Sequence, residues 1–289
     1  MSTATPDPRI RLRQLYEACP LCESKRFGRL REDDCRGHAG YDPGLPPTMV
    51  WCLCQDCGHC FVEGYLTAEG LDLLFKKTQD VQSPAAVFRP PDPSWLPGHF
   101  PVEQHRLAWA RIVERVTRLR GGLPTRADRW LDVGCGNGML LMTAWEWGYH
   151  AIGLDMRKDT VDMLQGMQVE AHRLDFQDFT AAPGSLAVIS MADVLEHMPF
   201  PKPALRHSAD LLRPDGLLFL SMPNGDTIVW KYLDSYKVSP YWIEIEHCHN
   251  FTKDRLFALL TETGFEPLDY DINHRYRSGM DIVARKRAG

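Results

Sequence analysis

Short apolar runs alternate with helical patterns along the chain from residue 129 onward. The runs are rich in Val, Ile and Leu and occupy residues 130–133, 150–155, 169–174, 186–192 and 216–222. They are too short for typical helices, whereas the stretches between them, such as 138–148 and 203–216, are long enough to be crossover helices. This alternation predicts an α/β domain with a doubly wound, largely parallel sheet.

The carboxyl end of the chain has a different pattern. Residues 265–286 form two strand-like runs joined by a loop that contains Ser278 and Gly279, with no helical pattern between them. Strands connected in this way pair antiparallel, whereas parallel strands need a long crossover. The expected fold is therefore a Rossmann-like mixed sheet, parallel except for an antiparallel hairpin strand at its C-terminal end.

A proline-rich stretch divides the chain. Residues 83–101 contain six prolines, which exclude a helix or a central strand, and an amphipathic helix is expected directly afterwards at Val102–Arg120. We expect a small domain over residues 1–80, a linker over 81–101 and the Rossmann-like domain over 102–289. Within the last, the aromatic-rich segment 225–250 lies between the fifth strand and a helix, where a substrate lid is expected.

Charge and cysteine usage narrow the class of protein. The formal net charge of −5 over 289 residues makes a large nucleic-acid surface unlikely. No apolar run has the length of a signal peptide or of a membrane span. The nine cysteines occur without a secretory signal, which favours a reducing compartment. We therefore expect a cytoplasmic protein that does not associate with membranes or nucleic acid; the oligomeric state stays open.

Two cysteine pairs in the small domain have the spacing of a zinc site. Cys19 and Cys22 form one C-x-x-C turn, and Cys54 and Cys57 form another after 31 intervening residues. Two such turns supply four thiolates to a closed tetrahedral site, which stabilises a small zinc-ribbon domain and leaves no open position for catalysis. The ligand choice near the second pair stays open, because three further candidates lie beside it: Cys52, His59 and Cys60.

The stretch after the first strand predicts a ligand-binding loop. Gly134, Gly136 and Gly138 follow the apolar run directly and precede a helix. Glycines at this edge of a parallel sheet allow unusual backbone angles and close approach of a ligand. A dinucleotide fingerprint would need a third glycine where Met139 stands. Asp132, two residues before the first glycine, suits a ligand with an ammonium group better than one with a pyrophosphate.

These residues together resemble the class I S-adenosylmethionine-dependent methyltransferases, from Arg129 to about Lys286. The resemblance implies that Asp155, at the end of the next strand, accepts hydrogen bonds from the ribose hydroxyls. Asp175 is expected to receive the adenine amino group. The neighbouring Phe176, and Asp193 at the start of the segment D-V-L-E-H, are also expected to contact the cofactor.

A second resemblance concerns candidate catalytic residues. The segment H-x-x-x-F-T at residues 247–252, followed by an amphipathic helix, is similar to a methyltransferase subgroup with an amino-terminal zinc knuckle. This subgroup includes sugar C-methyltransferases and natural-product methyltransferases. By motif, their active-site residues correspond to His197, Glu246 and His247, while Glu244 stands where they have tyrosine.

The expected function is transfer of a methyl group from S-adenosylmethionine to an oxygen or carbon of a small-molecule acceptor, such as a sugar, a nucleotide-sugar or a natural-product intermediate. The expected cofactors are S-adenosylmethionine and a structural zinc ion. Two alternatives remain: an RNA base methyltransferase that uses the zinc knuckle to recognise RNA, and a non-catalytic scaffold that binds partners through the zinc module.

Overall fold

The computed structural model describes residues 10–81, 102–275 and 278–287. The expected linker therefore lies outside the described residues, apart from Val81. Contacts within the chain define two compact units. The first consists of Met1–Val81, Glu196–Pro201 and Pro223–Leu256, and the second of Gln82–Leu195, Lys202–Met222 and Phe257–Gly289.

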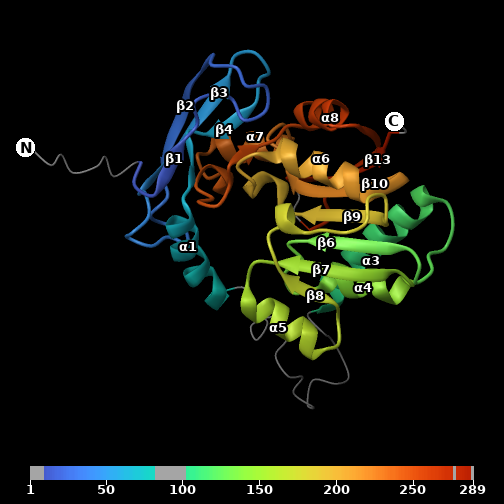
Figure 1. Ribbon diagram of the computed structural model, residues 1–289. Helices are drawn as coiled ribbons and strands as arrows, with labels where there is room; N and C mark the ends of the chain where they lie inside the picture. The colour runs from blue at the N-terminus through green and yellow to red at the C-terminus, as the bar shows by residue number, and fades with distance from the viewer. Residues whose placement is uncertain (1–9, 82–101, 276–277, 288–289) are drawn as a thin grey trace, which may run out of the picture. The chain divides into compact units, whose positions relative to one another are not determined.

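The second unit is built on a seven-stranded sheet with the order β12-β13-β10-β9-β6-β7-β8 (Figure 1). Neighbouring strands from β10 to β8 pair parallel, whereas β12 and β13 pair antiparallel. The expected Rossmann-like mixed sheet is thus confirmed. The strands are β6 (Arg129–Val133), β7 (His150–Asp155), β8 (Ala171–Arg173), β9 (Leu186–Ala192), β10 (Leu212–Pro223), β12 (Phe265–Ile272) and β13 (Gly279–Lys286).

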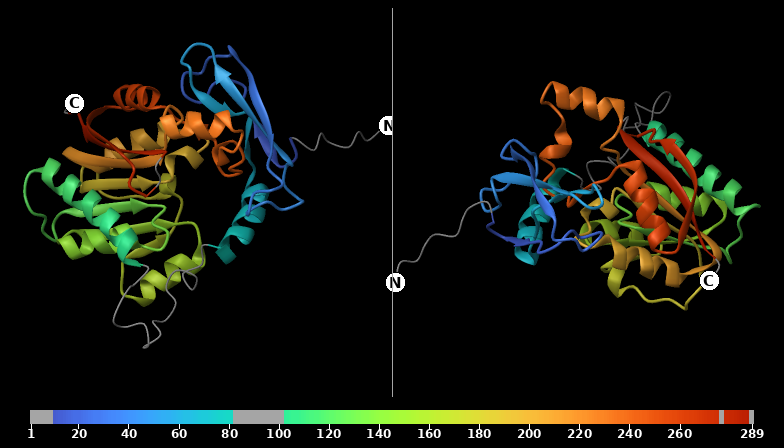
Figure 2. Two further views of the ribbon diagram at one scale, coloured as in Figure 1. Left: turned by 180° about the vertical axis from the view of Figure 1, so that it is seen from behind. Right: turned by 90° about the horizontal axis from the view of Figure 1, so that it is seen from above.

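Helices cover both faces of this sheet, with α3 on one face and α6 on the other (Figure 2). The helices are α3 (Val102–Arg120), α4 (Met139–Trp147), α5 (Lys158–Gly166), α6 (Pro201–Leu211) and α8 (Lys253–Glu262), with short 3₁₀ turns η2 (Phe176–Asp178) and η3 (Leu195–His197). Trp130 and Tyr149 pack edge to face in the core, and the Tyr149 hydroxyl is hydrogen-bonded to Thr117 of α3. Burial of such large side chains stabilises the domain.

One boundary differs from expectation. The helical pattern predicted at 203–216 ends in the structure at Leu211, and β10 begins at the next residue. Pro214 cannot continue a helix and Asp215 adopts a left-handed backbone conformation, with φ of 62°. The pairing of β10 with β9 shifts register between Leu212 and Leu217. The turn chemistry therefore overrides the helical periodicity.

The first unit contains a four-stranded sheet with the order β11-β4-β3-β2 and a two-stranded pair, β1 and β5. Strand β11 comes from the segment between β10 and α8, and it pairs antiparallel with β4. The elements are β1 (Arg13–Leu15), β2 (Phe27–Asp34), β3 (Thr48–Cys54), β4 (Cys60–Val62), β5 (Gly64–Leu66), α1 (Ala68–Val81), α7 (Ile228–Ser235), η4 (Pro240–Trp242) and β11 (His249–Asn250).

Most of the aromatic-rich segment packs onto the sheet of this first unit. Trp242 lies edge to face against Trp51 of β3, and the Trp51 indole N–H donates to the Trp242 carbonyl at 2.9 Å. Trp230 stacks on Tyr241 and meets Trp242 edge to face. The expected division assigned residues 225–250 to the methyltransferase domain, whereas their contacts group them with the cysteine-rich residues.

Among the described residues, none of the helices combines the length and the apolar character that a membrane span requires.

Candidate functional site

The glycine loop is shaped by its backbone. Gly134, Gly136 and Gly138 all have positive φ, at 64°, 52° and 75°, in the region that L side chains rarely adopt. The loop is tied to the next strand because the Cys135 N–H donates to the Leu154 carbonyl at 2.9 Å. It opens α4, whose N-cap is Gly138.

The space beside the Cα atom differs among the three glycines. A Cβ on Gly134 would lie 2.5 Å from Cγ2 of Val194, and a Cβ on Gly138 would collide with the side chain of Leu164. At Gly136 the nearest atom is the end of the flexible Arg157 side chain, 3.6 Å away. Gly134 and Gly138 are thus required by packing, whereas Gly136 is where a ligand has room to approach the backbone.

Asp132 lies beneath this loop on β6 and is 2% exposed. Its carboxylate accepts a hydrogen bond from the Ser190 hydroxyl at 2.6 Å, and Ser190 in turn accepts from the Trp130 indole N–H. Burial raises the pKa of Asp132 to about 7, an effect that the Ser190 hydrogen bond only partly offsets. A nearby cation would stabilise the ionised form of this buried carboxyl group.

Asp155 closes the other side of the loop. One carboxylate oxygen accepts the Gly136 N–H at 2.9 Å, and the other accepts the backbone N–H of Arg157. The Arg157 guanidinium also bonds the same carboxylate, at 3.0 Å from Nε and 3.1 Å from Nη2. Binding of a ribose diol here therefore requires Arg157 to share or to release Asp155.

Asp175 and Phe176 follow β8. Asp175 is exposed and caps η2, since its carboxylate accepts the Gln177 N–H at 2.8 Å. Phe176 is buried and packs against the ring of His207, with the centroids 4.9 Å apart. The Phe176 side chain thus has a packing role, and Asp175 keeps one oxygen available for a ligand.

Asp193 sits just after β9 with φ of 56°, a strained value for a residue other than glycine. Its carboxylate forms an ion pair with Arg275 at 2.7 Å, and its N–H donates to the Ser221 carbonyl. The Arg275 guanidinium lies over the Trp109 ring at 4.3 Å. Sequence analysis did not identify Arg275, because nothing in the local pattern links the C-terminal hairpin to the end of β9.

The four predicted thiols converge in the first unit. Cys19 Sγ lies 3.7 Å from Cys57 Sγ, and Cys22 Sγ lies 3.5 Å from Cys54 Sγ. All four sulfur atoms are within 4.8 Å of one another. The edge of a tetrahedral zinc–thiolate site is about 3.8 Å for a Zn–S bond of about 2.3 Å, so the arrangement fits a zinc ion.

The two knuckles share one backbone pattern. Glu23 N–H donates to the Cys19 carbonyl, and Gly58 N–H donates equivalently to the Cys54 carbonyl. Glu23 and Gly58 adopt nearly the same left-handed conformation, with φ of 61° and 67°. Glutamate thus occupies a position in the first turn that favours glycine, at a modest local cost.

The three alternative ligands lie outside this group. Among the described residues, the cysteine cluster contains only the four thiols named above, and Cys52, His59 and Cys60 join no other cluster of potential ligands. His59 is instead hydrogen-bonded to His249, at 3.0 Å from its Nε2 to Nδ1. His249 Nε2 in turn donates to the Met198 carbonyl.

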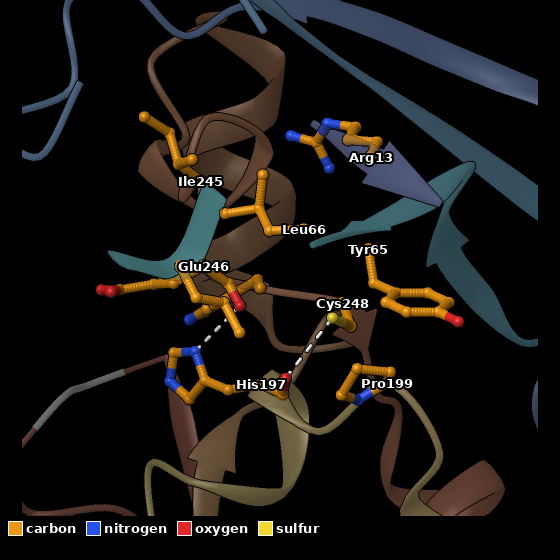
Figure 3. A pocket seen from close by; sticks show the side chains of 10 residues that line it. Arg13, Tyr65, Leu66, His197, Pro199, Ile245, Glu246 and Cys248 are labelled. Atoms are coloured by element: carbon orange, nitrogen blue, oxygen red, sulfur yellow. Dashed lines mark hydrogen bonds between the residues drawn. The ribbon is translucent and has the colours of Figure 1, made fainter. Parts of the chain in front are cut away.

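The candidate catalytic histidines face each other in the first unit. The rings of His197 and His247 are 4.8 Å apart and nearly perpendicular. His197 Nδ1 lies 3.1 Å from the Glu246 carbonyl, so it is the protonated nitrogen and leaves Nε2 as an acceptor (Figure 3). Glu196, which sequence analysis did not select, is buried, and its carboxylate belongs to one potential ligand group with both histidines.

Burial keeps His247 neutral. The side chain is 7% exposed, and its Nδ1 is buried without a hydrogen-bond partner. Burial, followed by the nearby His197 and His38, holds the pKa of His247 well below its usual value. The imidazole can therefore accept a proton at neutral pH. Glu246 is half-buried and contributes its backbone carbonyl to this pair, and in Figure 3 its carboxylate points away from His197.

Comparison with known proteins agrees with this geometry. A family model described as a methyltransferase domain matches residues 102–270. The ubiquinone biosynthesis O-methyltransferase of Aeromonas salmonicida is 32% identical over 41% of this chain and 50% of its own. That of Xanthomonas euvesicatoria is 35% identical over 33% of this chain and 43% of its own. The chain thus spans about half the length of the curated relatives it matches.

Solved structures share the fold. The 1,6-didemethyltoxoflavin-N1-methyltransferase of Burkholderia thailandensis, with bound 1,6-didemethyltoxoflavin and S-adenosylhomocysteine, has a TM-score of 0.54 and 17% identity, covering 81% of this chain and 98% of the other. The family model covers more than half of the chain. The chain therefore belongs to the methyltransferase domain family and has the class I S-adenosylmethionine-dependent methyltransferase fold.

Proposed function

We propose that this protein transfers a methyl group from S-adenosylmethionine to an oxygen or carbon of a small-molecule acceptor. The observation that carries the proposal is the glycine loop, in which Gly136 alone is open to a ligand while Asp132 and Asp155 lie on either side of it. The relatives named as O-methyltransferases favour an oxygen acceptor.

S-adenosylmethionine, when bound, would supply a sulfonium methyl group for transfer to the acceptor, with S-adenosylhomocysteine as the leaving group. Asp132 holds the ammonium group, and Asp155 accepts the ribose hydroxyls. The adenine side of the site is bordered by three residues: Asp175, Phe176 and Asp193. Positioning of this kind contributes roughly 7–11 kcal/mol to such a displacement.

His247 acts as the general base for the acceptor hydroxyl. Its low pKa keeps it unprotonated, and a base in this role typically contributes about 10²–10⁴ in rate. His197 is oriented by the Glu246 carbonyl and supports His247 across the ring contact. Glu196, buried in the same group, stabilises the imidazolium that forms when His247 takes the proton.

The cysteine cluster holds a structural zinc ion. Cys19, Cys22, Cys54 and Cys57 occupy all four positions of a tetrahedral site, so the metal has no open position for substrate. The metal holds together the two knuckle turns of a small sheet, and binding of such an ion is coupled to folding.

The test has two arms. Calorimetry with S-adenosylhomocysteine should give saturable, one-to-one binding, and Gly136→Ala should abolish it with only a modest fall in the melting temperature. Mass spectrometry of a panel of phenols, sugars and nucleotide-sugars incubated with S-adenosylmethionine should reveal a product heavier by one methylene unit. Absence of cofactor binding by the folded, zinc-containing protein would exclude the proposed activity.

A further inference from the structure

A buried arginine lines the cavity beside the candidate catalytic histidines. Arg13 lies on β1 and is 9% exposed. Its Nη1 donates to the Gly64 carbonyl at 2.7 Å, whereas Nε and Nη2 are buried and have no hydrogen-bond partner among the described residues. Within the described part of the chain, no carboxylate forms an ion pair with it. A buried guanidinium with two unpaired donors is costly, so this arrangement calls for a ligand.

The two unused nitrogens define the shape of that ligand. Nε–H and one Nη2–H point in the same direction along one edge of the planar guanidinium, while Nη1 is engaged at the opposite end. Such an edge donates two parallel hydrogen bonds and matches the two oxygens of a carboxylate or a phosphate. A neutral hydroxyl or a single carbonyl would leave one of these donors unsatisfied.

The cavity is suited to a small anionic group. It has a volume of about 40 Å³, and its lining includes Arg13, Leu66, His197, Ile245 and His247. A site for one water needs roughly 10–15 Å³, so this space accommodates the head group of a larger molecule. In Figure 3 the Arg13 guanidinium and the His197 imidazole lie on opposite sides of the set of labelled side chains.

The local charges favour an anion there. Burial lowers the pKa of Arg13, and the electrostatic interactions with Cys248, Cys35 and Glu63 offset this effect only in part. Glu246 also lines the cavity, but in Figure 3 its carboxylate points away from Arg13. His247 is neutral because its pKa is held low, so it does not compete for the anion.

We propose that the edge of Arg13 binds a carboxylate or phosphate group of the methyl acceptor inside this cavity. The assignment of the ligand as the acceptor rests on the proposed methyltransferase function; the anion site itself rests on Arg13 and the cavity. Held in this way, the acceptor has its oxyanion on Arg13 and another part directed toward His197 and His247.

The test measures the Arg13 side chain directly. Protein labelled with ¹⁵N-arginine is titrated with acetate, inorganic phosphate and acetamide, and the Nε–H resonance that disappears in Arg13→Gln is followed. Acetate or phosphate should move this resonance in a saturable way, and comparison of the two identifies which oxyanion is preferred. Acetamide has nearly the shape of acetate but no charge, and it should have at least about tenfold weaker effect.

One variant and a control complete the experiment. Arg13→Lys keeps the charge but loses the paired donors, and it should weaken anion binding by about tenfold while the protein stays folded. Arg36→Gln, on an exposed arginine paired with Asp34 in the same unit, should leave binding unchanged. The proposal is overturned if neither anion shifts the resonance, if acetamide acts equally, or if Arg13→Lys binds as the wild type does.

The two proposals can fail separately. Titration with S-adenosylhomocysteine on the same sample tests the cofactor site through calorimetry, independently of the Arg13 signal. Anion binding without cofactor binding would support the Arg13 site and remove the methyltransferase function. Cofactor binding without an anion response would support the cofactor site and rule out the anion site at Arg13.

Discussion

The affinity for the cofactor should depend on pH through Asp132. Burial raises the pKa of this carboxyl to about 7, so in the free protein it is largely protonated below that pH. A bound ammonium group stabilises the ionised form and lowers the pKa again. Binding therefore releases a proton, and the affinity is fully present above pH 7 and falls as the pH decreases through the free-state pKa.

The expected magnitude follows from this pKa. If the bound form titrates well below pH 6, the apparent dissociation constant for S-adenosylhomocysteine at pH 6 is about tenfold higher than at pH 8, equivalent to about 1.4 kcal/mol. The stability of the free protein has the opposite trend. Because the folded-state pKa lies above the unfolded value of 3.8, ionisation of Asp132 reduces the free energy of unfolding as the pH rises from about 4 to 7.

Calorimetry from pH 5.5 to 8.5, in buffers with different ionisation enthalpies, measures both the affinity and the number of protons released. Asp132→Asn should weaken binding at pH 8 and remove the pH dependence between 6 and 8, while it stabilises the free protein at pH 8 by a few kcal/mol. Asp162→Asn, on an exposed carboxylate of α5 in the same unit, serves as the matched control and should behave as the wild type.

A flat affinity across this range, with no proton released by the wild-type protein, would refute the reasoning. So would a pH profile that survives in Asp132→Asn, because the titrating group would then be another residue.

Three further predictions concern the loop, the base and the metal. Gly136→Ala should abolish cofactor binding in calorimetry with a loss of stability of only about 1 kcal/mol, whereas Gly138→Ala, whose Cβ collides with a buried leucine, should also lower the melting temperature strongly. His247→Gln should reduce kcat by about 10²–10⁴ without loss of cofactor affinity, and an unchanged kcat would exclude it as the base. Elemental analysis should find one zinc per chain, lost together with thermal stability in Cys54→Ser but retained in Cys35→Ser, whose thiol only donates to a backbone carbonyl.

Much of the fold was accessible from local pattern. The apolar runs of β6, β7, β9 and β10 alternate with helices at the expected periods, and the absence of a helix between β12 and β13 predicted their antiparallel pairing. These features are local because hydrophobic periodicity reports which side of an element is buried. The cluster of four thiols was predictable for a similar reason, since a C-x-x-C turn brings its two sulfurs together within four residues.

Contacts between residues far apart in the chain could not be predicted from the local sequence pattern. The contact of His197 with His247 and the ion pair of Asp193 with Arg275 each join segments that no period connects. The aromatic segment was expected on the Rossmann-like domain, but its contacts lie with β3 and β4 of the first unit. Such choices depend on the packing of whole elements, which local propensity does not encode.

The sequence by itself determined that a glycine loop follows the first strand of a methyltransferase-like sheet and that four cysteines are paired for a metal. Only the tertiary structure decided which glycine has open space beside its backbone, because that depends on Val194 and Leu164 approaching from other elements. It also decided that Nε and Nη2 of the buried Arg13 have no hydrogen-bond partner among the described residues, in a cavity that the histidines also line. Burial, unlike periodicity, is set by every segment that surrounds a side chain, and it controls the charge and reactivity of these residues.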